Sequence, residues 1–129
     1  MSLQIEPLTS NLASSRNWVA AQALDRGLSR DHLPLLKLLS SELITNAILH
    51  GPARGLVTIR VLRMDGHLRV EVDDEGVAPP RLRNPETGEI GGRGILLIDT
   101  YATRWGWERR PALGKTVWFD LSVNQPRTE

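Results

Sequence analysis

The sequence contains no cysteine, and its 129 residues include only one tyrosine and one phenylalanine. The absence of cysteine excludes disulfide bridges, thiolate metal sites and a cysteine nucleophile, and it is compatible with a reducing compartment. No uninterrupted apolar stretch approaches the roughly 20 residues that a membrane span requires. The amino-terminal residues also lack the basic and apolar segments of a secretory signal. We therefore expect a cytoplasmic protein that does not associate with a membrane.

Neither sign of charge predominates, because 16 Lys and Arg residues nearly balance 15 Asp and Glu residues, for a net charge of +1. This balance provides no electrostatic argument for binding nucleic acid or a membrane surface. With 40% hydrophobic and 24% charged residues, the composition is typical of a globular protein. A chain of this length is sufficient for a hydrophobic core. We predict one domain over residues 1–129.

The first third of the chain predicts a short strand followed by two helices. Alternating apolar residues indicate an edge strand over 3–8. A helix should follow, with Thr9 or Ser10 as its N-cap and Gly27 at its end. Asp31 is the expected N-cap of the second helix, which a His-Gly-Pro sequence then terminates.

The rest of the chain is rich in strand signals. Strands over 56–64 and 68–73 should form a hairpin through Asp65-Gly66, a dipeptide favoured in type I′ turns. A long irregular segment over 74–94 follows, and segments of this length usually serve as functional lids or are disordered. A helix over 95–102 and strands over 105–109 and 116–123 come last. We predict an α+β fold, a two-layer α/β sandwich whose mostly antiparallel sheet carries helices on one face.

Glu42 and Asn46 interrupt the predicted apolar face of the second helix. At about 100° per residue they lie roughly 40° apart. A buried carboxylate or amide needs compensation, so the pair indicates a polar ligand, an activated water or a hard cation such as Mg²⁺. The alternative is that both polar side chains find hydrogen-bond partners at the edge of the helix.

His50, at the end of the same helix, either belongs to this site or complements the helix dipole. Leu35, Leu39 and Leu49 are expected on the apolar face of this helix, and Lys37, Ser40 and Ser41 in the exposed sector.

Two later segments have the chemistry of a nucleotide site. A strand that buries Val70 and Val72 should point Asp74 inward, where its carboxylate can accept a hydrogen bond from a purine amine. The alternative for this segment is a solvated acidic turn. The glycines of 91–94 allow backbone N–H groups to approach an anion at a helix N-terminus, and Arg93 could contact phosphate. The alternative for these glycines is a flexible turn.

Four short segments follow one another along the chain: Glu42 to His50, Asp74-Glu75-Gly76, Gly92-Arg93-Gly94 and Gly114-Lys115-Thr116. In this order they resemble the N box, the start of the G1 box, the G2 box and the final Gly-Thr element of the GHKL (Bergerat-fold) ATP-binding superfamily, which includes gyrases, Hsp90 chaperones and histidine kinases. The short chain and its Gly-Lys-Thr-Val-Trp-Phe segment further resemble the stand-alone anti-sigma-factor serine/threonine kinases of bacterial partner switching.

The resemblance implies ATP and Mg²⁺ as ligands. It implies that Asn46 holds Mg²⁺, that Glu42 is the general base toward the attacking hydroxyl, that Asp74 receives the adenine amine and that Thr116 holds the adenine end. The implied partners are an anti-sigma antagonist with an acceptor serine and a sigma factor, and the protein itself is expected to form a homodimer. The other implied cofactor-binding residues are His50, Gly76, Gly92, Arg93 and Gly94, the last three beneath a lid over 79–91.

One position departs from the family pattern. The G1 box usually continues with a second glycine, and Ala78 stands there, followed by Pro79-Pro80. Crowding at this point could weaken nucleotide affinity, so a non-catalytic nucleotide-binding regulatory module is the alternative function. The catalytic fragment of a histidine kinase is less favoured, because no histidine lies in a predicted dimerising helical hairpin. A structural domain without a ligand would leave Glu42 and Asn46 unexplained.

Overall fold

The computed structural model describes residues 1–80 and 94–123. Within these ranges it has five strands, three α-helices and two short 3-10 helices. In chain order they are β1 (Ser2–Ile5), η1 (Thr9–Asn11), α1 (Leu12–Asp25), η2 (Arg30–His32), α2 (Leu33–His50), β2 (Val57–Met64), β3 (His67–Asp74), α3 (Gly94–Tyr101), β4 (Arg104–Arg109) and β5 (Lys115–Ser122).

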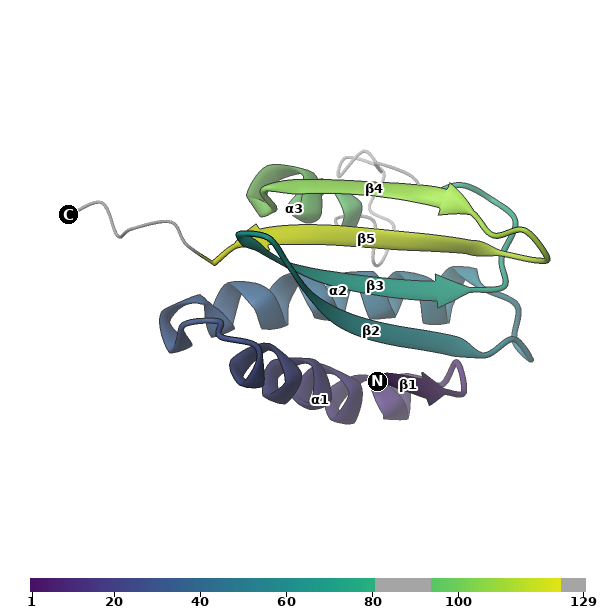
Figure 1. The fold of residues 1–129 in the computed structure, drawn as a ribbon. Helices are drawn as coiled ribbons and strands as arrows, with labels where there is room; N and C mark the ends of the chain where they lie inside the picture. Colours follow the sequence, from purple (N-terminus) through teal and green to yellow (C-terminus); the bar gives the residue numbers. More distant parts are fainter. Residues whose placement is uncertain (81–93, 124–129) are drawn as a thin grey trace.

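The strands form one sheet in the order β1-β2-β3-β5-β4, in which every neighbouring pair is antiparallel. All three α-helices lie behind the sheet in Figure 1, and α2 contacts both α1 and α3. The predicted α+β sandwich with helices on one face is therefore confirmed. In the described part of the chain, no helix combines the length and the apolar character needed to cross a bilayer.

The end of α1 was predicted correctly. Gly27 adopts φ +97°, a left-handed conformation that glycine reaches without the cost of a side chain. This allows the Leu28 N–H to donate to the Ala23 carbonyl at 3.0 Å. The chain thereby satisfies a carbonyl of the last helical turn and leaves the helix.

The predicted N-caps of both helices are wrong. Thr9 and Ser10 belong to the 3-10 turn η1, and α1 begins only at Leu12. Asp31 lies inside η2, where its backbone N–H donates to the Ser29 hydroxyl at 3.2 Å. In both cases a 3-10 turn precedes the α-helix, which moves the helix start beyond the residue with the best capping side chain.

The central hairpin is confirmed, with Met64 opposite His67 across the two-residue connection. Gly66 has φ +72°, whereas every described residue with positive φ is a glycine. Asp65 therefore has negative φ, and the type I′ turn, which requires positive φ at both central residues, is not formed.

The buried face of α2 differs from the prediction. Ser40 is fully buried, whereas Leu49 is 46% exposed, the reverse of their expected positions. Glu42 and Asn46 are partly exposed and lie beside the buried face rather than at its centre. The helix is apolar around most of its circumference, so its sequence does not define a single face. Its buried apolar residues are Leu36, Leu39, Leu43, Ile44, Ala47 and Ile48.

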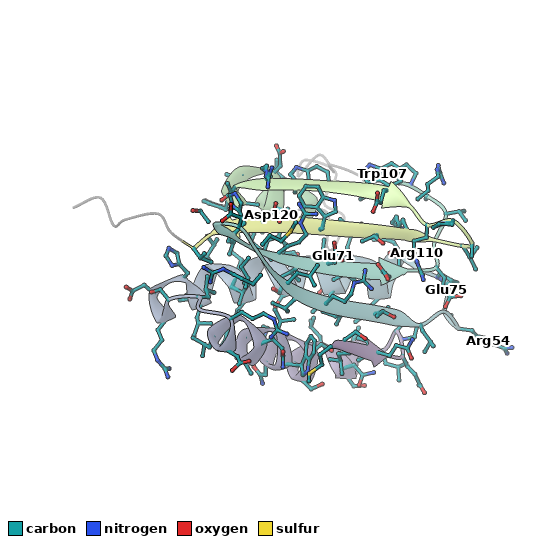
Figure 2. All side chains as sticks on the ribbon, viewed as in Figure 1. Arg54, Glu71, Glu75, Trp107, Arg110 and Asp120 are labelled. Atoms are coloured by element: carbon teal, nitrogen blue, oxygen red, sulfur yellow. The ribbon has the colours of Figure 1, made fainter. Side chains whose placement is uncertain are left out.

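The face of the sheet away from the helices carries a layer of ion pairs. Asp120 is fully buried and stands between Arg69 and Arg104 in the register of the strands. Its carboxylate accepts hydrogen bonds from Arg69 Nε at 2.7 Å and from Arg104 Nη2 at 3.0 Å. The Arg69 guanidinium also lies 3.8 Å from the ring centre of Trp118. Figure 2 shows Asp120 on β5 and Glu71 on the adjacent β3.

A second ion-pair group continues this layer toward β2. Arg60 donates to both carboxylate oxygens of Asp73 at 2.7 Å and to Glu71 at 2.9 Å. Burial acts to raise the pKa of Asp73, but hydrogen bonds from Arg60 and Thr116 and the charges of Arg60 and Arg110 outweigh it, so the pKa is lowered. Arg69, Glu71 and Asp73 thus share the face of β3 opposite the core.

Candidate functional site

A cavity of about 180 Å³ lies between α2 and the sheet, beside the end of β3 and the start of β5. It brings Asn46 and His50 of α2 together with Asp74 of β3, and all three were predicted as site residues. The residues that line it are Leu43, Asn46, Ala47, His50, Val72, Asp74, Ala78, Pro79, Pro80, Lys115 and Val117.

Asp74 points inward, as its place in the strand predicted, and is 3% exposed. Its Oδ1 accepts the backbone N–H of Gly76 at 2.7 Å and the ammonium group of Lys115 at 3.0 Å. A side chain at Gly76 would put its Cβ 2.9 Å from Asp74 Oδ1 and 3.2 Å from Lys115 Nζ. Glycine at this position therefore leaves room for the Asp74–Lys115 ion pair.

Gly114 brings the start of β5 against the end of β3. It has φ +89°, and a Cβ there would collide with the Asp74 carbonyl oxygen and lie 2.7 Å from Glu75 Cα. Both its conformation and its packing thus require glycine. This close backbone contact holds Lys115 beside Asp74.

The same end of the sheet is tied to its neighbouring loops. The Glu75 carboxylate accepts the backbone N–H of Leu56 at 2.7 Å, and Arg109 donates to the Val77 carbonyl at 2.9 Å. These bonds hold the segment that follows Asp74, which contributes Ala78, Pro79 and Pro80 to the cavity wall.

The Thr116 side chain lies on the other face of the sheet. Its hydroxyl donates to Asp73 Oδ1 at 2.6 Å, and it is not among the residues that line the cavity. The role expected for Thr116 at the adenine end does not agree with this placement. Lys115 and Val117 face the cavity instead. The alternation of β5, already visible in Val117 and Phe119, was the signal that could have identified Lys115.

Asn46 and Glu42 lie one helical turn apart on α2, but only Asn46 lines the cavity. Burial raises the pKa of the Glu42 carboxyl. No group of three or more His, Asp or Glu side chains is placed to hold a metal within 1–80 and 94–123. The amide oxygen of Asn46 is nevertheless a ligand type that Mg²⁺ accepts, and Mg²⁺ commonly completes its shell with substrate phosphates and water. The site therefore fits Mg²⁺ bound together with a phosphorylated ligand.

The predicted phosphate-binding glycines are only partly described. Gly94 is the first residue of α3, as predicted from the apolar run that follows it. Gly92 and Arg93, together with most of the expected lid over 79–91, lie outside the described residues.

Comparison with known families identifies a match over most of the chain. The profile of the family described as "Histidine kinase-like ATPase domain" matches residues 5–121. This span includes every predicted site residue.

Two curated relatives align along almost their whole length. The anti-sigma F factor of Geobacillus sp. (strain WCH70) is 38% identical over an alignment covering 98% of this chain and 94% of the relative. The anti-sigma F factor of Geobacillus stearothermophilus is 29% identical, with 99% of this chain and 95% of the relative covered.

Solved structures share the fold. The histidine kinase domain of the Erythrobacter litoralis blue-light activated histidine kinase has a TM-score of 0.57 and 25% identity, covering 88% of this chain and 62% of that one. The RsbU and RsbW domains of a Mycobacterium tuberculosis protein give a TM-score of 0.66 at 17% identity, covering 98% of this chain and 33% of that one. This chain thus spans only part of both of these proteins.

Proposed function

The chain belongs to the family of histidine kinase-like ATPase domains, and from this membership we propose that it is an ATP-dependent serine/threonine kinase of the anti-sigma-factor type. It transfers the γ-phosphoryl group of ATP to a serine of an antagonist protein, and it sequesters a sigma factor when that antagonist is phosphorylated. The end-to-end alignment with proteins named anti-sigma F factor supports this proposal. It acts in the cytoplasm as a homodimer, for which the first strand and helix are the proposed interface.

The observation that carries the proposal is the convergence of Asn46 and Asp74 on one cavity, with Gly76 against the Asp74 carboxylate. Asp74 accepts a hydrogen bond from the adenine amine, and the phosphates extend toward Asn46. Asn46 would hold Mg²⁺, and the ion would neutralise charge on the phosphates. Phosphoryl transfer asks a protein mainly for positioning and charge neutralisation, so these few groups are sufficient.

Glu42 is the general base of the proposed reaction. The acceptor hydroxyl oxygen forms a bond to the γ-phosphorus, the bond to the β–γ bridging oxygen breaks, and Glu42 takes the hydroxyl proton. ADP and a phosphoserine are the products. The pKa of Glu42 is raised by burial, which makes its carboxylate a stronger base than an exposed glutamate.

Nucleotide binding is tested by thermal denaturation with ATP and Mg²⁺. A ligand at 100 times its Kd stabilises the folded state by about 2.7 kcal/mol, which corresponds to a rise in Tm of roughly 8–12 °C for a domain of this size. An unchanged Tm at millimolar ATP and Mg²⁺ would contradict the proposal. CTP, which lacks a purine, is the matched control.

Catalysis is tested separately with Glu42→Gln. We expect this variant to bind ATP but to transfer labelled phosphate to the antagonist about 10²–10⁴ times more slowly. Glu6→Gln, which neutralises an exposed glutamate after β1, is the control and should transfer normally. If regulation of the sigma factor survives Glu42→Gln unchanged, the protein acts as the non-catalytic nucleotide-binding module instead.

A further inference from the structure

Lys115 is one of only two lysines in the chain, the other being Lys37. Lys37 is exposed, whereas Lys115 is 5% exposed. A lysine is almost never fully buried unless it is paired, and Lys115 is paired with Asp74 in the wall of the cavity. The proposed mechanism gives Asp74 a role at the base of the nucleotide and gives Lys115 none.

The Asp74–Lys115 ion pair offers a donor and an acceptor next to each other. Gly76 N–H and Lys115 Nζ both donate to the same oxygen of Asp74, Oδ1. A carboxylate has a second oxygen that accepts hydrogen bonds, and an ammonium group has three N–H donors. The pair can therefore meet a ligand edge that carries one donor beside one acceptor.

Adenine and the 6-oxopurines both have such an edge, but the positions of the donor and the acceptor are exchanged. Adenine carries an amine donor at position 6 beside the N1 acceptor, whereas hypoxanthine and guanine carry a 6-oxo acceptor beside an N1–H donor. A carboxylate placed opposite position 6 would favour adenine and repel a 6-oxo group, because two acceptors would face each other. With Lys115 beside it, the 6-oxo group receives a hydrogen bond from the ammonium, and N1–H donates to Asp74.

Resting on the proposed nucleotide-binding function, we infer that Lys115 bonds to the edge of the purine base and that this cavity therefore takes 6-oxopurine nucleotides as well as adenine nucleotides. Adenine binds with its amine on Asp74 and N1 on Lys115. Hypoxanthine and guanine bind with their 6-oxo group on Lys115 and N1–H on Asp74. The close approach of Gly76 to both charged groups keeps the pair free of an intervening side chain.

Isothermal titration of the full chain with ATP and with ITP, each with Mg²⁺, tests this inference. ITP differs from ATP only in the 6-position and the protonation of N1, so the ratio of the two Kd values isolates this edge. For the wild type we expect the Kd values of ATP and ITP to differ by less than about tenfold. In Lys115→Met both Kd values should rise about 10–100-fold, because each base loses its hydrogen bond to the charged ammonium group. Lys37→Met should leave both Kd values unchanged.

The wild-type ratio decides the question even if Lys115→Met does not fold. Binding of ATP with rejection of ITP beyond tenfold would overturn the inference and leave the proposed function intact. Unchanged Kd values for both nucleotides in folded Lys115→Met would also overturn it. Failure of both nucleotides to bind would overturn the proposed function and the inference together.

Discussion

Removing one member of the Asp74–Lys115 ion pair should destabilise the fold more than removing one member of a surface ion pair. The Nζ–Oδ1 distance is 3.0 Å, and the two side chains are only 6% and 4% exposed. At an effective dielectric constant of about 20, opposite unit charges at this distance attract by roughly 5–6 kcal/mol, while desolvation of both charges opposes this. Removing one partner leaves the other charge buried alone, which typically costs about 3–5 kcal/mol.

A double-mutant cycle in urea at pH 7 measures this coupling. We expect Asp74→Asn and Lys115→Met each to lower the free energy of unfolding by about 3 kcal/mol, a shift of roughly 1.5–2 M in the urea midpoint. The asparagine retains an oxygen for the Gly76 N–H. The double variant should lose at least about 2 kcal/mol less than the sum, because neither charge is then left alone.

The control for this cycle is Lys37→Met, which removes the exposed lysine of α2. It should change the free energy of unfolding by less than about 0.5 kcal/mol. Solvated surface ion pairs contribute less than about 1 kcal/mol. The contrary result is that Lys115→Met lowers the free energy of unfolding by no more than this, with additive effects in the double variant. That result would refute the reasoning from burial.

Three further predictions concern the surroundings of the cavity. Gly114→Ala should lower the free energy of unfolding, measured in urea titrations, by more than about 2 kcal/mol. The reason is that left-handed backbone strain of about 1–2 kcal/mol adds to the collision of the new Cβ with Asp74. Gly66→Ala, at φ +72°, is the control for the backbone strain alone. Glu42→Gln should stabilise the fold at pH 7, because the raised pKa makes the ionised carboxylate unfavourable when folded, and urea titrations should show the gain disappear below pH 4.5. The lowered pKa of Asp73 contributes stability above pH 3.8 that is lost as pH falls through its folded-state pKa. Acid titration followed by circular dichroism should therefore show a shallower loss in Arg60→Met.

The strands were predictable because each carries a clear alternation. Val70 and Val72 identified the buried face of β3, and the alternation of side chains then predicted that Asp74 points to the same face. The same rule applied to Val117 and Phe119 places Lys115 in the cavity and Thr116 outside it. The family motif drew attention to the threonine, whereas the pleat of the strand determines which side chain faces the ligand.

The orientation of α2 was not predictable from its sequence. Apolar residues surround the helix, so Leu49 was as reasonable a core residue as Leu43 until the sheet was in place. The burial of Ser40 depends on neighbouring elements and has no local signal. The helix starts were missed for a related reason: single 3-10 turns precede α1 and α2, and short turns of this kind leave little trace in composition.

The position of β5 has a consequence for synthesis. It is the last strand among the described residues, yet it pairs between β3 and β4 rather than at an edge of the sheet. A nascent chain synthesised only as far as the residues before β5 lacks Lys115 and Val117, and so lacks one wall of the cavity. Pairings between distant segments form late in folding. Nucleotide binding therefore signals that translation has passed β5 and that this strand has been inserted between β3 and β4.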